Sequence, residues 1–437
     1  MGFSWSSFVA QSQLLSSCAR AGLAADVILC DDLPAPFDVS DVFGLATDDV
    51  VHFTTCGAAR SQERMASLDA ALVADGVLRN CDKDVNGSLD GTAVGVDLCD
   101  GTFLAPSAPK LLAALAHGAD LLARPLVSPA ELHSCLGVVQ WFDLLNRLLF
   151  SALDVVYDFV RDPDDHVPRV LPPAVRSELL VALLLAPLME ADLTRPWLPL
   201  LAATDASDAF GFGACVSPVS PVEARRVGRL GEKRGDFVRL RRDGGPTDEA
   251  ARPRLGTPHT LRLAKSDFRT VLSVRAKEQA HSGLLEATGL VMTVDWLLRS
   301  VARRSHRVAV LVDAKTVLCA AVKGRSSSPG LLRILRRLAA RVLAGDLFLR
   351  LVYVPSEDNP ADAPSRGVRG RAPPRLPCAQ RGRCRVDGRP LRGDALAAHR
   401  LSAALERRRG CLERDHRDWG SSGAPSIASG ALADDDD

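Results

Sequence analysis

Apolar positions in the first 105 residues alternate between helical spacing and short runs of strand length. Within residues 40–53, two apolar runs flank Asp48 and Asp49, and this pattern predicts a β-hairpin with the two aspartates at its turn. Helical spacing predicts α-helices on both sides of the hairpin. The other elements predicted here are a helix over residues 1–30, a helix over 61–74 and a strand near 92–98.

Residues 106–194 are rich in leucine and alanine at helical spacing, with breaks at polar or proline-containing segments. From residue 195 to residue 366, apolar runs of strand length alternate with helical segments, which is typical of an α/β domain. Residues 217–262 interrupt this alternation with charged, proline- and glycine-rich sequence, so we predict an inserted, partly mobile loop. The helices predicted in the leucine-rich region span residues 111–122, 129–153 and 173–189.

Residues 367–437 form the last region, which is rich in arginine, proline and glycine and ends in four aspartates. This composition predicts a disordered tail that contains one helix, over residues 393–409. The pattern therefore divides the chain into regions 1–105, 106–194, 195–366 and 367–437.

Composition narrows the classes of protein to which the chain can belong. Of its 437 residues, 47% are hydrophobic, which is enough for apolar cores in two or three domains. The net charge of +1 does not mark the whole chain as a binder of polyanions, although arginines become frequent toward its end. The 11 cysteines are irregularly spaced, and no apolar run reaches the roughly 18 residues of a membrane span. We therefore expect reduced thiols and a cytoplasmic or nuclear location.

Four acidic residues lie where a strand ends or a helix begins. Asp205 and Asp313 follow apolar runs of strand length, Glu286 opens an apolar helix, and Asp362 comes after a third predicted strand. Two divalent cations about 4 Å apart need several carboxylates in one pocket, and such positions hold side chains rigidly. We predict that all four acids are catalytic metal ligands. The simpler interpretation of each one alone is a surface or capping carboxylate.

The segments around these acids resemble the ribonuclease H domain of retroelement reverse transcriptases. Residues 204–207 read Thr-Asp-Ala-Ser and residues 211–214 read Gly-Phe-Gly-Ala, as in the first two strands of that family. Residues 285–287 read Leu-Glu-Ala, Asp313 ends a strand, and residues 359–366 match the pattern Asn-x-x-Ala-Asp-x-x-Ser-Arg. The resemblance implies an α/β fold with a mixed five-stranded sheet and flanking helices.

The same resemblance implies a function and its partners. The expected activity is hydrolysis of the RNA strand of RNA–DNA hybrids with two Mg²⁺ ions, or with Mn²⁺ in their place. The expected partners are the hybrid and its phosphate backbone, without a membrane, while protein partners are not indicated. The arginines among the expected contacts recur at helical spacing, so a solvated helix face is the alternative for them. The residues expected to contact nucleic acid are Ser207, Gly211, Gly213, Lys315, Arg333, Arg336 and Arg337.

Residues 1–105 resemble the end of a reverse transcriptase palm, and the helical region then corresponds to thumb and connection. Residues 47–50 read Thr-Asp-Asp-Val, which resembles the polymerase box with its paired Asp48 and Asp49. Lys83 resembles a residue that assists the leaving pyrophosphate, and a solvated surface lysine is the equal alternative. The type of element resembled is the tyrosine-recombinase (dictyostelium-type) retrotransposon. The family's third palm carboxylate and its fingers have no counterpart here, so we expect a truncated element without polymerase activity of its own.

Three alternatives remain open at this point. The first is a complete RNA-directed DNA polymerase and ribonuclease H whose N-terminal fingers lie outside this sequence. The second is a catalytically dead retroelement relic that only binds nucleic acid. The third is a resolvase or integrase on the same fold, although the pattern at residues 359–366 favours ribonuclease H over it.

Overall fold

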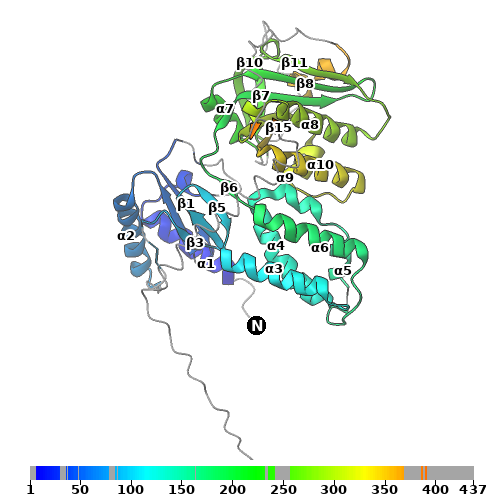
Figure 1. Ribbon diagram of the computed structural model, residues 1–437. Coiled ribbons are helices and arrows are strands. Elements are labelled where there is room, and N and C mark those ends of the chain that lie inside the picture. Colours follow the sequence, from blue (N-terminus) through cyan, green and yellow to red (C-terminus); the bar gives the residue numbers. More distant parts are fainter. Residues whose placement is uncertain are drawn as a thin grey trace, which may run out of the picture.

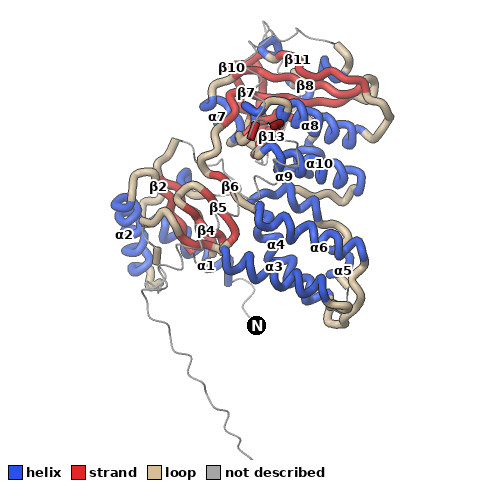
Figure 2. The backbone as a smooth tube through the Cα atoms, in the orientation of Figure 1, coloured by secondary structure: helices blue, strands red, loops and turns tan. Residues whose placement is uncertain are grey.

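The computed structural model describes residues 6–29, 36, 38–47, 49–77, 84–85, 87–162, 164–231, 235–241, 256–368, 385–386 and 389–390. These residues form an N-terminal α/β region, a helical region and an α/β domain on a five-stranded sheet (Figures 1 and 2). The helix predicted over 393–409 lies outside the described residues. The tail contributes one short pairing, between β14 (Arg385–Val386) and β15 (Arg389–Pro390). Among the described helices, none is both long enough and apolar enough to cross a membrane.

The first helix is shorter than predicted. Helix α1 (Ser6–Arg20) ends ten residues before the predicted limit of 1–30, because Gly22 adopts a φ of 72° and reverses the chain. The Leu23 N–H then donates to Cys18 O at 3.0 Å, which satisfies a carbonyl at the end of the helix. A glycine after a helical segment is a stop signal, and it outweighs the apolar residues that follow.

The predicted hairpin is confirmed. Strand β1 (Asp41–Ala46) pairs in antiparallel fashion with β2 (Asp49–Thr54), and Ala46 lies opposite Asp49 next to the turn. Asp49 is thus the first residue of the second strand, whereas Asp48 lies outside the described residues. The predicted second helix is also present, as α2 (Ala58–Ala74), and it packs against the hairpin.

The strand predicted near residues 92–98 is two strands. Val94 and Gly95 have φ values of 51° and 76°, so they form a tight turn in the middle of the segment. Apolar residues on both sides of this turn made the segment 92–98 resemble one continuous strand. The strands of this second, four-stranded sheet are β3 (Gly91–Ala93), β4 (Val96–Cys99), β5 (Phe103–Pro106) and β6 (Ala191–Asp192), in the order β3-β4-β5-β6.

The helical region contains the predicted helices, with one interruption. The segment predicted as a single helix over 129–153 becomes a 3₁₀ helix, η3 (Leu144–Ala152), after residue 143, and Asn146 within it is non-helical, with φ −146° and ψ 82°. At the other end, the Ser128 side chain accepts from Glu131 N–H in a capping box. The α-helices are α3 (Ala108–Ala123), α4 (Pro129–Asp143), α5 (Val156–Val160) and α6 (Pro173–Leu185).

The α/β domain has the predicted mixed sheet of five strands. Their order is β11-β8-β7-β12-β13. Strand β8 is antiparallel to β7 and to β11, whereas β12 is parallel to β7 and to β13. This order and these directions are consistent with a ribonuclease H-like fold. The strands are β7 (Trp197–Ala206), β8 (Gly211–Pro218), β11 (Arg269–Arg275), β12 (Arg307–Val312) and β13 (Phe348–Tyr353).

Both faces of this sheet are covered by other elements. Side chains alternate between the two faces along each strand, so both faces carry apolar residues that need cover. In β12, Val308 and Val310 pack on one face, and Ala309 and Leu311 pack on the other. The first face lies against α8 (Ser282–Leu298), α9 (Lys315–Lys323) and α10 (Pro329–Gly345), and the second against α7 (Pro221–Gly228) (Figure 1).

The insertion at residues 217–262 was predicted to be a loop, but it contains a helix and strands. Its described part includes α7 and the parallel strands β9 (Phe237–Arg241) and β10 (Pro258–Ala264). Val227 and Val238 from this part are buried against the sheet. The prediction was wrong because abundant charges separate the few apolar residues and conceal an amphipathic pattern. The apolar side of this segment packs on one face of the five-stranded sheet.

The helical region and the α/β domain share one apolar core. Phe142, Leu149 and Met189 of the helical region belong to the same buried cluster as Val310 of the sheet. The αL turn at Gly324 also touches η3, since an added Cβ would lie 1.6 Å from Arg147 O. The two regions therefore depend on each other for burial of apolar surface.

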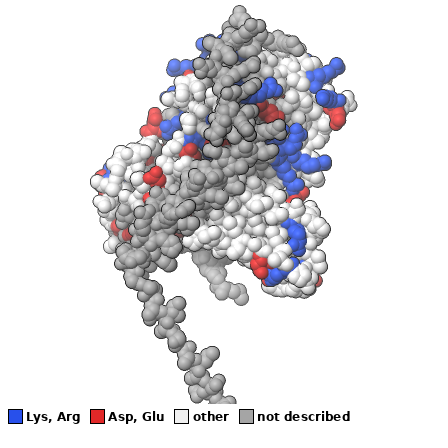
Figure 3. Space-filling model, viewed as in Figure 1, with Lys and Arg blue, Asp and Glu red and all other residues white. Residues whose placement is uncertain are grey.

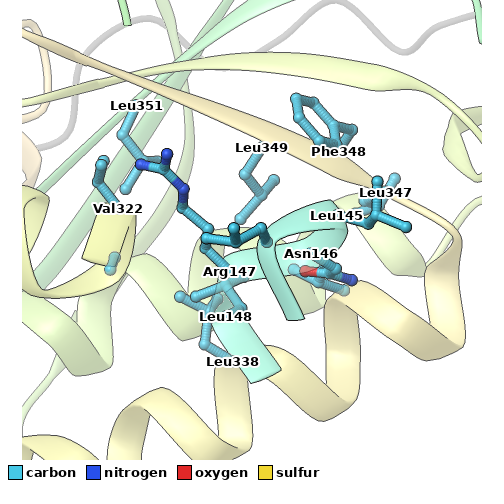
Figure 4. A pocket seen from close by; sticks show the side chains of 13 residues that line it. Leu145, Asn146, Arg147, Leu148, Val322, Leu338, Leu347, Phe348, Leu349 and Leu351 are labelled. Atoms are coloured by element: carbon cyan, nitrogen blue, oxygen red, sulfur yellow. The ribbon is translucent and has the colours of Figure 1, made fainter. Parts of the chain in front are cut away.

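A cavity of about 230 Å³ lies at this joint. Figure 4 shows Arg147 of η3 extending toward Leu351 of β13 and Val322 of α9, while Asn146 lies on the other side of η3, toward Leu347. The break in helical geometry at Asn146 falls at this cavity.

Arg336 of α10 ties the two regions together. Its Nε donates to Ser151 O at 2.7 Å, and its guanidinium lies 2.8 Å from Glu178 Oε1. We predict that Arg336→Met lowers the free energy of unfolding by about 1–3 kcal/mol, because a half-buried carboxylate and a carbonyl lose a charged partner. Urea unfolding of the full chain measures this loss. Arg333→Met, on the exposed side of the same helix, is the matched control, and equal losses in both variants would contradict the assignment.

Candidate metal centre

Two of the predicted acids lie at the ends of neighbouring parallel strands. Strand β12 pairs with β7 so that Val312 lies opposite Thr204. Asp313 and Asp205 are the next residue in each case, so they lie side by side at the same edge of the sheet, Asp205 still within β7 and Asp313 directly after β12. Asp205 is 5% exposed, and its position is fixed by a central strand with partners on both sides.

The third acid reaches this edge from a helix. Glu286 lies in the second turn of α8, which packs across β7. Close approach depends on Gly289, where an added Cβ would lie 3.3 Å from Asp205 O and from Thr204 Oγ1. Asp205, Glu286 and Asp313 each offer an oxygen, and these oxygens lie within 4.8 Å of one another. We call these three residues the carboxylate triad.

Burial and mutual repulsion disfavour ionisation within the carboxylate triad. Burial, followed by the charge of Asp313, raises the pKa of Asp205 to about 7. Burial, followed by the charges of Asp205 and Asp313, raises the pKa of Glu286 to about 9. Such a site is costly for the protein alone and is stabilised by any bound cation.

The carboxylate triad could hold a metal ion. Glu286 Oε2 and Asp313 Oδ1 are buried, and neither has a hydrogen-bond partner within the described part of the chain. Buried polar atoms without partners are rare and costly in folded proteins. Three carboxylates are also the donor set that hard divalent cations prefer, so the residues present fit such an ion.

Asp362 is near the carboxylate triad but does not belong to it. It begins the short helix α11 (Asp362–Ser365), it is half-buried, and Arg366 Nη2 lies 2.9 Å from its Oδ1. Its negative charge contributes to the raised pKa of Asp205, so the two carboxylates sense each other. The structure thus brings together three of the four predicted ligands, and metal ligation by Asp362 stays a prediction.

The two glycines that were predicted to contact nucleic acid have a packing role in the structure. Both are buried, and an added Cβ at Gly213 would lie 2.5 Å from Ser365 N, while one at Gly211 would lie 2.3 Å from Val274 O. Only glycine allows α11 and β11 to come so close. Ser207 lies at the turn after β7 and donates its N–H to Gly211 O at 2.7 Å.

The four predicted basic contacts are all exposed, and one of them, Arg336, also bonds to the helical region. Lys315 is exposed at the start of α9, two residues after Asp313, and its Nζ lies 4.6 Å from the Tyr353 ring centroid. Arg333 and Arg337 are exposed on α10, and Figure 3 shows Lys and Arg side chains gathered over this part of the surface. Arg336 is committed to the helical region, as described above. Its predicted contact with nucleic acid stays a prediction.

The residues of the suggested polymerase remnant can be placed only in part. Asp49 is exposed at the hairpin turn, while Asp48 and Lys83 lie outside the described residues. A polymerase site is therefore not defined by the structure.

Two polar residues that the sequence did not indicate as functional support the site. The Asn359 side chain donates to Thr204 O and accepts from Ala361 N, each at 3.0 Å, and Ser365 Oγ donates to Asp205 Oδ2. Both belong to the segment 359–366 that carried the resemblance, but only its aspartate was assigned a role. Their complete burial was not visible in the sequence.

No family model matches the chain, and no curated protein matches it. Among solved structures, the foamy viral protease-reverse transcriptase dRH in complex with ds DNA is similar at 8% identity and a TM-score of 0.32, covering 79% of this chain and 48% of that one. The foamy viral protease-reverse transcriptase in complex with RNA/DNA hybrid gives 9% identity and a TM-score of 0.29, covering 75% of this chain and 58% of that one. The chain thus spans about half the length of these two, and the class of fold rests on its strand order.

We predict that Glu286→Gln stabilises the metal-free chain by roughly 1–3 kcal/mol at pH 8, because it removes a half-buried negative charge that Asp205 and Asp313 repel. The folded-state pKa values of Asp205 and Glu286 lie above those of the unfolded chain. Their contribution to stability is therefore complete below about pH 4 and is lost as the pH rises through the folded values. Urea unfolding in EDTA from pH 5 to pH 9 measures the widening gap between variant and wild type.

Glu278→Gln, at an exposed position, is the control for this substitution. Added Mg²⁺ narrows the gap between Glu286→Gln and wild type, because the cation stabilises only the intact carboxylate triad. A gap that is absent at every pH would show that Glu286 is not under electrostatic strain.

Proposed function

We propose that the chain is a ribonuclease H-type endonuclease that hydrolyses the RNA strand of RNA–DNA hybrids. The observation that carries the proposal is the convergence of Asp205, Glu286 and Asp313 at one edge of the mixed sheet. Among the described residues, one buried oxygen of Glu286 and one of Asp313 have no hydrogen-bond partner. The strand order supports the same class of fold. Perturbed carboxylates that meet in this way are more often functional than structural.

The carboxylate triad would hold Mg²⁺, or Mn²⁺ in its place, through oxygen ligands. When bound, divalent cations supply a water of lowered pKa and neutralise charge on the departing oxygen. The contribution of the chain is to fix the ligands before substrate arrives: β7 and β12 hold two of them, and α8 holds the third. Asp362 would add a fourth carboxylate once it separates from Arg366.

Substrate would lie across the sheet edge and reach the exposed basic residues. Lys315 is two residues from Asp313, and Arg333 and Arg337 face solvent on α10. Such groups hold a phosphate backbone without regard to sequence. Discrimination between RNA and DNA would come from contacts with the 2′-hydroxyl.

We also propose that the chain derives from a retrotransposon reverse transcriptase. The hairpin of β1 and β2, with Asp49 at its turn, supports a palm origin for the first region. Polymerase activity is not part of the proposal.

The full chain is expected to cleave a labelled RNA–DNA hybrid in Mg²⁺, to cut only the RNA strand, and to lose this activity in EDTA. Asp313→Asn is expected to lower kcat/KM at least about 100-fold, which corresponds to roughly 2.7 kcal/mol of transition-state stabilisation. Asp158→Asn removes an exposed carboxylate of α5 and is expected to leave the rate unchanged.

Double-stranded DNA, double-stranded RNA and single-stranded RNA complete the set of substrates. Equal cleavage of double-stranded DNA would point to a resolvase-like or integrase-like nuclease instead. A folded chain that cleaves none of the four substrates would contradict the proposed enzyme and leave the binding-only relic.

A further inference from the structure

Ser365 connects the buried aspartate of the carboxylate triad to the segment that bears Asp362. Its side chain is completely buried, and its Oγ hydrogen-bonds to Asp205 Oδ2. The same Oγ lies 2.7 Å from Asp362 O, three residues back in α11. A hydroxyl has one proton, and the charge-assisted bond to an ionised Asp205 is the stronger of the two.

An aspartate in this position needs such an anchor. The terminal torsion of an aspartate side chain has a broad preference, so the backbone alone does not fix the plane of the carboxylate. Glu286 and Asp313 repel Asp205 when all three are ionised, because their oxygens lie within 4.8 Å of one another. A neutral donor that holds one oxygen fixes the carboxylate plane without adding a positive charge that would compete with a metal ion.

Ser365 is itself held firmly. An added Cβ at Gly213 would lie 2.5 Å from Ser365 N, so α11 rests directly on strand β8. Ser273 Oγ of β11 donates to Pro364 O at 2.9 Å, and Asn359 binds the end of β7. The hydroxyl therefore approaches Asp205 from a support that is fixed at three points, as a positioning group requires.

We propose that Ser365 is a positioning residue that orients Asp205 for metal binding. This inference rests on the metal-binding part of the proposed function, and not on the identity of the substrate. Groups that hydrogen-bond to ligating carboxylates typically change metal affinity by roughly 10–100-fold when removed.

The test measures the affinity of the full chain for Mn²⁺ in the absence of nucleic acid. Electron paramagnetic resonance reports the concentration of free Mn²⁺ during the titration. Ser365→Ala is expected to weaken binding roughly 10–100-fold relative to wild type. With hybrid substrate, the half-saturating Mg²⁺ concentration is expected to rise by a similar factor, while KM for the hybrid at saturating Mg²⁺ stays unchanged. A general loss of structure would instead change KM and kcat together.

Ser151→Ala is a closely matched control. Ser151 is also buried, and its Oγ also lies 2.7 Å from a carbonyl oxygen three residues back, to which it donates, but it lies in η3 of the helical region. The two variants differ chiefly in the contact with Asp205. Ser365→Thr retains the hydroxyl and is expected to recover most of the Mn²⁺ affinity, and urea unfolding in EDTA verifies that each variant is folded.

Each outcome bears on the inference. Equal Mn²⁺ affinity in wild type and Ser365→Ala, or equal weakening in Ser365→Ala and Ser151→Ala, would overturn it. A folded wild-type chain that takes up no Mn²⁺ would overturn both the inference and the metal centre. Mn²⁺ binding that weakens in Ser365→Ala, in a chain that does not cleave the hybrid, would support the inference and reject only the proposed function.

Discussion

The parallel pairing of β7 with β12 is the constraint on which the candidate site depends. It places Asp205 beside Asp313 by register alone, because Thr204 lies opposite Val312. The other features of the site bring further groups to that edge: Gly289 lets α8 approach with Glu286. The result is a cluster of negative charge that the folded chain holds at a cost, as the raised pKa values of Asp205 and Glu286 indicate. Strain of this kind is typical of sites that are completed by a ligand.

The α/β domain cannot be separated from the helical region without loss of buried surface. Phe142 and Leu149 lie in the same apolar cluster as the sheet, and Arg336 bonds across the joint. A fragment limited to residues 195–366 would expose this surface to water. Functional experiments therefore need the full chain, and changes in the helical region are expected to reach the carboxylates through shared packing rather than through direct contact.

Sequence reasoning succeeded where a single local pattern decides the structure. Apolar runs that end in an acid correctly located Asp205 and Asp313, since strand length and burial follow from the run itself. It failed where structure depends on distant partners. The apolar residues of α7 and β9 were hidden among charges, the break at Asn146 has no proline or glycine to mark it, and the burial of Ser365 follows from tertiary contacts alone. For Asp362, the pattern of residues 359–366 indicated the acid but not its ion pair with Arg366.

The central claim is that the carboxylate triad binds a divalent metal ion. The most direct test is to locate Mn²⁺ by anomalous diffraction in crystals of the full chain soaked with the ion. The account predicts an anomalous peak within ligand distance of the carboxylates of Asp205, Glu286 and Asp313, and its loss in Asp313→Asn. A folded chain that shows no peak between these three side chains, or shows one only elsewhere, would contradict it.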